Sequence, residues 1–545
     1  MSTSPLSSAS QNSFPSPSKM ERGAGVRIVI LLLLLSGLLF FFKLGSFSLY
    51  DAAETTYGEF VKNILNTGDW ITLHYNGQII FDKPPLYFWL AAILSKIIGF
   101  NEFAMRFWAA LAGVLTVLTT YALAKVFYNK RVGFLSGIIS MTAFQLLVQS
   151  RIAELDIVLA LFITLSLLLF YLGYQSNKKL YYLLSYFPMA LAVLIKGILG
   201  VALPGFAIFL FLLLKKELWK VKGLHVLPGI IIIAAIGLPW YIAEYLLHGK
   251  IFLEFALGFL FLSRFQGVVS GHTGPWYYYF PAILLGFAPW SHFLPYGLWR
   301  AFRNWKSDPE LLSLCLILPA FLVFSIAKTK IPNYVLPLYP FLAIMVGKLW
   351  NDFFEEKEKL KRGMAISNLF FALVVTLIII GFIFVGKSNY PAEYTIFIPS
   401  LLALAAVLII GSLLSIILFF FKSYKLSFAS IPVMVFIITL ILTVKILPLV
   451  ENFKGAKPLG QELKKVIQIN QEVAAFEIGN RPSVVLHSPK PVRFLDGEKE
   501  LLSFLKKKEG YVFTTVDEYE KIKADLPKSF KIFGRKGNLL AIYQL

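Results

Sequence analysis

The sequence predicts a polytopic α-helical membrane protein that ends in a small α/β domain. Hydrophobic residues make up 57% of the 545 positions and charged residues only 15%, a composition too apolar for a soluble chain of this size. Several apolar runs approach the roughly 20 residues that a helix needs to cross a bilayer. Short basic clusters separate these runs, as is typical of cytoplasmic loops.

The net charge and the cysteine content exclude two further classes of protein, nucleic-acid-binding proteins and proteins held by internal disulfides. The net charge of +21 comes from basic clusters between apolar runs, so we attribute it to membrane topology and contact with membrane lipids, and expect no nucleic-acid binding. The only cysteine is Cys315, which rules out a disulfide within the chain.

The N-terminal segment, residues 1–25, is rich in Ser and Pro and is expected to be a disordered cytoplasmic tail. The apolar run that follows, 26–42, has the basic flank of a signal peptide, but no small-x-small cleavage site comes soon after it. We interpret it as a retained first span.

The basic clusters set the direction of each crossing. If all of them face the cytoplasm, the apolar runs pair off between them and give about thirteen transmembrane helices within a domain over 26–448. The clusters lie at 128–131, 176–179, 215–222, 300–306, 355–362 and 422–425, and the later spans are predicted at 103–127, 132–149, 154–174, 180–195, 197–214, 226–246, 277–299, 310–327, 331–350, 364–386, 396–421 and 426–448.

Two segments are predicted to lie along the membrane interface. Residues 86–100 are short for a span and contain Lys96, and counting them as a crossing would reverse every later basic cluster. Residues 54–66 place Tyr57 and other apolar side chains on one helical face. This topology brings several charged segments to the outer face, namely 51–59, 81–85, 150–156, 194–197, 328–334 and the loop 247–276.

The tail, 449–545, is predicted to be an extracytoplasmic α/β domain. Its Lys/Glu-rich helical patterns alternate with short β-type runs. Helices are expected at 461–468 and 498–508, and strands at 483–488, 511–515 and 539–544. It carries no phosphate-binding loop and no nucleophile elbow, so nothing marks it as catalytic.

The chemistry is expected from charged groups near the membrane, because the chain has no P-loop, GxSxG, HExxH or CxxC motif. Asp156 lies at the start of a predicted span, and a charged group near hydrocarbon suggests a function. An acid at this position can also simply complement the helix dipole. Lys196, next to Gly197 and Gly200, suits a phosphate, although a lysine there can also snorkel to the interface.

The remaining candidates lie in the outer segments. Lys83 precedes two prolines that fix its backbone direction, and Tyr334 is either a site residue or part of an aromatic belt. A divalent metal bound by Asp82 and His272 is an open alternative to a lone loop histidine, and no other cofactor is expected. Glu54 and Asp51 are candidates for a general base or for an anchor of a substrate hydroxyl. Alternatively, they are simply solvent-exposed residues at the start of a helix.

Six motifs resemble the lipid-dependent GT-C-fold glycosyltransferases, most closely the group that contains the 4-amino-4-deoxy-L-arabinose transferases of lipid A and the protein O-mannosyltransferases. They occur in the same order and with similar spacing over 28–350. The motifs are DAAETTYGEFVKNILNTGDW (51–70), NGQIIFDKPPLYFWL (76–90), GFNEFAMRFWAALAG (99–113), SRIAELD (150–156), LIKG with ALPG (194–205) and KTKIPNYVLPLYP (328–340).

The resemblance implies an enzyme of the bacterial cytoplasmic (inner) membrane. It would move a sugar from a polyprenyl phosphate, expected to be undecaprenyl phosphate, to a lipid, glycan or protein at the outer face, with inversion at the sugar carbon. The polyprenyl-phosphate-linked sugar and this acceptor are the expected partners.

The resemblance also implies site residues. The Asp-Glu pair of the family aligns with Ala53-Glu54, so the aspartate is missing and Asp51 is the candidate substitute. Asp156 matches a second acidic position. Asp82-Lys83 matches the acidic-Lys-Pro-Pro turn of the family, and Lys196 and Tyr334 match groups near the donor phosphate. Because the leaving phosphate needs cations, Lys83, Arg151 and Lys196 are the candidates to contact it, and Tyr57 is a further candidate for binding the substrate.

Two alternatives remain open at this point. A polyprenyl-linked sugar flippase would be expected to show inverted repeats, and the sequence has no convincing internal symmetry. A scaffold that has lost its activity is the other alternative, for which Ala53 is the main argument.

Overall fold

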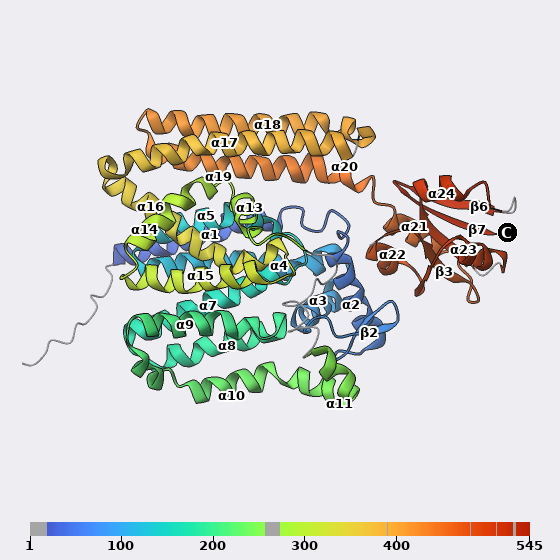
Figure 1. The fold of residues 1–545 in the computed structure, drawn as a ribbon, viewed down its shortest axis with the longest axis horizontal. Helices are drawn as coiled ribbons and strands as arrows, with labels where there is room; N and C mark the ends of the chain where they lie inside the picture. The colour runs from blue at the N-terminus through green and yellow to red at the C-terminus, as the bar shows by residue number, and fades with distance from the viewer. Residues whose placement is uncertain are drawn as a thin grey trace, which may run out of the picture.

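A bundle of long helices makes up most of the molecule, and a small α/β unit projects from one end of it (Figure 1). The structure is a computed structural model that describes residues 19–256, 273–389, 391–479, 481–507, 510–526 and 530–544. The predicted fold class, a helical membrane protein with a small α/β region at its C-terminal end, is confirmed.

The bundle consists of long helices joined by short turns, several of them 3-10 or π turns. Its helices are α1 (Lys19–Phe41), α4 (Glu102–Phe127), α5 (Lys130–Thr142), α6 (Phe144–Gln149), α7 (Asp156–Ser176), α8 (Lys179–Lys196), α9 (Leu199–Leu214), α10 (Val226–Gly237), α11 (Pro239–Glu254), α13 (Tyr279–Gly286), α14 (Leu294–Arg303), α15 (Asp308–Ile326), α16 (Tyr339–Glu355), α17 (Lys357–Asn389), α18 (Pro391–Phe420), α19 (Tyr424–Ile441) and α20 (Leu447–Glu451). The short turns are η1 (Leu218–Leu224), η3 (Ser291–Phe293), η4 (Pro332–Leu338) and η5 (Leu442–Ile446).

Among the described residues, six helices are long and apolar enough to cross a membrane, and a seventh crossing results if the bent pair η1 and α10 counts as one span. The six are α4, α7, α8, α15, the Thr395–Phe420 part of α18, and the segment Tyr424–Glu451. The count of about thirteen spans therefore stays a prediction.

Proline explains why some predicted spans are interrupted. Pro239 opens α11 directly after α10, so the segment 226–246 divides between two helices. Pro332 and Pro337 lie in η4, ahead of α16. Because proline has no N–H to donate, it favours the start of a helix over its interior.

The two segments predicted to lie along the membrane interface both form helices, and their position at the interface stays a prediction. They are α2 (Ala53–Thr67) and α3 (Leu86–Ile98), joined through the antiparallel hairpin of β1 (Leu73–Tyr75) and β2 (Gln78–Ile80). Tyr57 of α2 packs on Phe88 of α3 with their ring centroids 5.2 Å apart. Gly68 ends α2 with φ of 75°, a conformation that glycine adopts without strain.

The bundle has two chemically different ends. Helices α2 and α3 lie beside the α/β unit at one end, which we call the site end (Figure 1). Helix α14 and the turn between α9 and α10 lie at the opposite end, which we call the basic end. The basic cluster 215–222 lies in that turn, and the cluster 300–306 covers the end of α14 and the residues that follow it. Both lie away from α2 and α3, and the side of the membrane that they face stays a prediction.

The α/β unit has a five-stranded sheet with strand order β4-β3-β5-β7-β6. Strand β3 pairs in parallel with β4 and β5, whereas β7 pairs antiparallel with β5 and β6. The elements are α21 (Ala456–Leu463), β3 (Glu472–Phe476), α22 (Pro482–His487), β4 (Val492–Leu495), α23 (Glu498–Lys506), β5 (Gly510–Thr515), α24 (Val516–Ile522), β6 (Phe530–Lys536) and β7 (Leu539–Gln544).

One predicted strand of this unit is wrong. Residues 483–488 fall mostly within the helix α22, which Pro482 begins. The run of Val484, Val485 and Leu486 suits a strand by propensity, but all three side chains are buried as part of the helix. Tertiary packing therefore overrides the local preference. The predicted helix at 461–468 is also displaced, because α21 starts and ends earlier.

Candidate active site

Segments from five parts of the chain meet at the site end. The loop between α6 and α7, residues 150–155, contacts the start of α2, and the start of α7 contacts the end of α8, which in turn contacts Tyr334 of η4. These contain most of the side chains that the sequence singles out. Their contacts show which of them the fold brings together.

Lys196, Asp156 and Tyr334 form one group. Lys196, the last residue of α8, makes an ion pair with Asp156, the first residue of α7. The Lys196 ammonium also lies 4.9 Å from the ring centroid of Tyr334. Because Lys196 sits between an anion and an aromatic face, its ammonium is held in place, as an anion-binding group at this position would require.

Glu54 is held by a buried ion pair that the sequence does not reveal. Its carboxylate accepts hydrogen bonds from Arg106 Nε at 2.8 Å and Arg106 Nη2 at 2.7 Å, and each side chain is only 2% exposed. The backbone N–H groups of Tyr50 and Ala153 donate to the same carboxylate at 2.9 and 2.6 Å. Glu54 therefore ties the start of α2 to α4 and to the loop 150–155. Its catalytic role stays a prediction.

Arg151 anchors the other side of this loop. Its guanidinium donates to the carbonyl oxygens of Leu39 at 2.6 Å and of Phe42 at 2.8 Å, at the end of α1. A cation at the C-terminus of a helix satisfies carbonyls that have no partner within the helix. The structure thus gives Arg151 a contact with the protein backbone, and its predicted contact with the donor is untested.

Asp51 contacts the α/β unit. Its two carboxylate oxygens accept hydrogen bonds from the Ser483 N–H at 2.7 Å and from the Ser483 hydroxyl at 2.6 Å, and Thr55 donates to it at 2.9 Å. At the other end of α22, Lys62 donates to the Leu486 carbonyl at 2.7 Å. An acid therefore lies at the positive end of α22 and a lysine at its negative end, the arrangement that the helix dipole favours.

Lys83 and Asp82 form an ion pair of 2.9 Å in the turn before Pro84. Both side chains make further interactions. His272, the second predicted metal ligand, lies outside the described residues. Within the described parts of the chain, no group of three or more His, Cys, Asp and Glu side chains is placed to hold a metal ion.

Tyr57 packs among aromatic side chains of α2 and α3. It is 7% exposed and packs between Phe60 and Phe88, with centroid distances of 6.1 and 5.2 Å. Its observed surroundings are those of a core residue between α2 and α3.

Two further charged residues lie at the site end that the sequence did not mark as site residues, Arg106 and Glu154. The signal for Arg106 is a charge inside the predicted span 103–127. Glu154 stands two positions before Asp156, and no hydrogen bond or ion pair reaches its carboxylate from any residue that the structure describes. Burial and the neighbouring charge of Asp156 raise the pKa of Glu154 to about 8.

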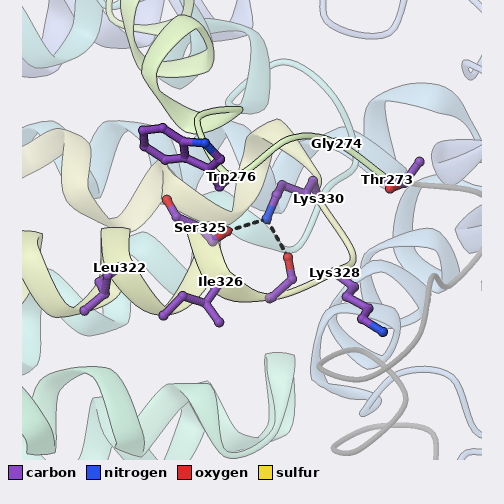
Figure 2. Close-up of a pocket in the computed structure, with 9 residues that line it drawn as sticks. Thr273, Gly274, Trp276, Leu322, Ser325, Ile326, Lys328 and Lys330 are labelled. Carbon is purple, nitrogen blue, oxygen red and sulfur yellow. Dashed lines mark hydrogen bonds between the residues drawn. The ribbon is translucent and has the colours of Figure 1, made fainter.

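A pocket opens at the end of α15. Its volume is about 350 Å³, and Figure 2 shows the residues that line it. Lys330 is 4% exposed and donates to the carbonyls of Ser325 at 2.7 Å and Ala327 at 2.5 Å. The lining residues are Thr273, Gly274, Trp276, Leu322, Ser325, Ile326, Ala327, Lys328 and Lys330.

The pocket has a mixed character and a link to the Lys196 group. Trp276, Leu322 and Ile326 are exposed apolar side chains, whereas Lys328 adds an exposed cation. Phe324, which precedes the lining residue Ser325, packs on Tyr334 with ring centroids 5.7 Å apart. An amphipathic molecule with an anionic group fits a pocket of this composition.

Known proteins resemble the chain over most of its length. The model of the family described as dolichyl-phosphate-mannose-protein mannosyltransferase matches residues 82–242. An uncharacterized protein of Aquifex aeolicus is 31% identical, over 81% of this chain and 83% of that protein. The undecaprenyl phosphate-alpha-4-amino-4-deoxy-L-arabinose arabinosyl transferase 2 of Proteus mirabilis is 30% identical, over 71% of each chain.

The fold has a solved counterpart. The crystal structure of ArnT from Cupriavidus metallidurans bound to undecaprenyl phosphate superimposes with a TM-score of 0.81 at 20% identity, covering 94% of this chain and 97% of that one. This similarity extends through the bundle and the α/β unit alike.

Proposed function

Because this chain belongs to the family of the undecaprenyl phosphate-alpha-4-amino-4-deoxy-L-arabinose arabinosyl transferases, we propose that it transfers a sugar from undecaprenyl phosphate to an acceptor at the outer face of the cytoplasmic membrane. The chain is a multi-pass membrane glycosyltransferase of the GT-C fold that uses a lipid-phosphate sugar donor. The sugar, the acceptor, the side of the membrane and the roles of the residues belong to the proposal.

Lys196 carries the proposal for the donor site. The leaving group of the reaction is a polyprenyl phosphate, whose negative charge grows as the bond to the sugar breaks, and fixed cations stabilise such charge. Lys196 is held at the site end by Asp156 and by the ring of Tyr334. In this proposal the phosphate binds Lys196 in competition with Asp156, and Lys83 and Tyr334 complete its surroundings. Arg151 ties the loop 150–155 to the end of α1.

The pocket at the end of α15 is proposed to receive part of the donor. Its apolar residues Trp276, Leu322 and Ile326 suit an isoprenoid chain, and Lys328 suits the phosphate that the chain carries. The ring contact between Phe324 and Tyr334 links the pocket to Lys196. The isoprenoid chain and the phosphate of the donor would then bind at adjacent places.

The sugar and the acceptor are proposed from the family. The names of the relatives give undecaprenyl phosphate-alpha-4-amino-4-deoxy-L-arabinose as the sugar donor. We take this donor as the first to test. The acceptor is a lipid, glycan or protein, with a lipid A-type glycolipid as the first candidate. The site end faces the outside in this proposal because the basic clusters of the opposite end favour the cytoplasm.

The test is a transfer reaction with purified, full-length protein. The protein in detergent micelles receives undecaprenyl phosphate-alpha-4-amino-4-deoxy-L-arabinose together with total membrane lipids of a strain that lacks this protein. We expect release of undecaprenyl phosphate and a sugar-bearing product, both followed by mass spectrometry. A donor that remains intact over many hours, with a known family member active in parallel, would contradict the proposed function.

A further inference from the structure

We propose that Glu154 is the general base of the reaction, which requires the acceptor to present a neutral hydroxyl group. This inference rests on the proposed function and deepens it, because it names the proton acceptor and the chemical class of the acceptor group.

Other carboxylates of the site end already have hydrogen-bond or ion-pair partners. Asp51 is hydrogen-bonded to Ser483 and Thr55, and Glu54 is saturated by Arg106 and two backbone N–H groups. Asp156 is paired with Lys196.

Asp82 is likewise paired, with Lys83, and Ala53 has no group that can take a proton. Of these acids in the described chain, Glu154 is the one whose carboxylate has no hydrogen bond or ion pair.

The neighbours of Glu154 in the loop 150–155 hold its backbone in place. The preceding residue, Ala153, is fixed by its N–H bond to Glu54, and Arg151 fixes the loop to the end of α1. Asp156, two residues later, is fixed by Lys196. Glu154 thus has little freedom to move away from the Lys196 group, yet its side chain remains partly accessible. A carboxylate that is positioned but unengaged is what a proton acceptor needs.

Burial and nearby charges shift the pKa of Glu154. The groups that act on Glu154 are the anions Asp156 and Glu54 and the cations Lys196 and Lys83. Burial and Asp156 raise the pKa of Glu154 to about 8, so the group changes charge near neutral pH. A base is most effective when its pKa lies close to the working pH, because it is then both available and able to hold the proton.

The proposed step balances in atoms and charge. The acceptor oxygen forms a bond to the anomeric carbon of the sugar, and the bond from that carbon to the phosphate oxygen breaks with its electron pair. Polyprenyl phosphate leaves as a dianion, near the cations Lys196 and Lys83. The hydroxyl proton moves to the Glu154 carboxylate and later to water. A phosphate acceptor is already anionic and would have no proton to give, which is why the proposal selects a hydroxyl.

The experiment compares Glu154→Gln, Glu154→Asp and the matched exposed control Glu498→Gln in the donor assay described above. We expect Glu154→Gln to lower kcat by about 100-fold or more with the donor KM within about twofold. Glu154→Asp should retain intermediate activity, and the control should match the wild type. The wild-type kcat should rise with pH toward a plateau above about 8, and this rise should disappear in Glu154→Gln.

A second readout is the linkage in the product. A glycoside of a hydroxyl survives mild acid, whereas a glycosyl phosphate is cleaved, so we expect an acid-stable product. Full activity of Glu154→Gln, or an acid-labile product, overturns this inference while leaving sugar transfer intact. A wild-type protein that leaves the donor untouched overturns the proposed function itself. If Glu154→Gln does not fold, the wild-type pH profile and the Glu154→Asp variant still test the inference. A wild-type kcat that does not rise with pH, together with full activity of Glu154→Asp, would overturn it.

Discussion

Asp51 and Ser483 are separated by 432 positions in the chain, yet the Asp51 carboxylate accepts hydrogen bonds from both the N–H and the hydroxyl of Ser483. The segment that leads into α2 is thereby joined to the helix α22 of the α/β unit. Asn76 adds a reciprocal pair of bonds with the backbone of Val492, at 2.8 and 2.6 Å. The α/β unit, which offers no catalytic motif, is therefore held against the segment that leads into α2 and against the turn between β1 and β2.

Replacing Asp51 by Ala should loosen α22. The variant leaves the N–H and hydroxyl of Ser483 without their acceptor, and the loss of a cap of this kind costs about 0.5–2 kcal/mol. Amide hydrogen exchange measured across 482–488 should become faster. The control Ser503→Ala, at an exposed position of α23, should leave exchange in α22 unchanged. Equal protection of α22 in Asp51→Ala and wild type would contradict the docking role.

Replacing Glu54 by Gln should destabilise the protein. The buried Arg106 would lose its counter-charge, and removing one partner of such a pair costs about 3–5 kcal/mol. The double variant Glu54→Gln with Arg106→Gln should recover part of this loss. The midpoint of thermal unfolding in detergent measures both effects. A Glu54→Gln protein that keeps wild-type stability but no longer transfers sugar would support the catalytic role expected from the sequence.

Replacing Lys196 by Ala should impair use of the donor. Loss of the ammonium next to the phosphate is expected to lower kcat/KM for the donor at least tenfold, or about 1.4 kcal/mol. Lys222→Ala, an exposed substitution in η1 at the basic end, is the control and should behave as the wild type. Unchanged donor kinetics in Lys196→Ala would remove this residue from the phosphate site.

Acid should weaken the α/β unit through His487. Burial, aided by Lys457 and Lys62, lowers the pKa of His487 from 6.5 to about 4. Between these values the unfolded chain binds a proton that the folded chain does not, so stability is lost as the pH falls below about 6.5. Thermal unfolding at pH 7.5 and pH 5 should show a smaller decrease for His487→Gln than for the wild type. An identical decrease in both proteins would show that other groups are responsible.

Much of the fold could be predicted from the sequence because the membrane imposes strong patterns. Apolar runs, basic clusters and the amphipathic segment that became α2 each reflect a single local constraint. The strand predicted at 483–488 failed because α22 depends on packing with distant elements, including the contact of Asp51 with Ser483.

The site could be predicted in its composition but not in its pairing. Asp156, Lys196 and Tyr334 were recognised separately, and the structure shows that they meet. The partner of Glu54 could not be inferred, since Arg106 lies 52 positions away within an apolar run. Equally, that the Glu154 carboxylate has no hydrogen bond or ion pair with any described residue is a property of the folded arrangement and not of its local sequence.

The most direct test of sugar transfer is mass spectrometry of membrane lipids, glycans and envelope proteins from a deletion strain and its parent. We predict that the deletion removes one sugar from a defined acceptor and that the polyprenyl-phosphate-linked sugar accumulates. An unchanged set of sugar-bearing acceptors, with the polyprenyl-linked sugar retained on the inner leaflet, would contradict the transferase and indicate a flippase.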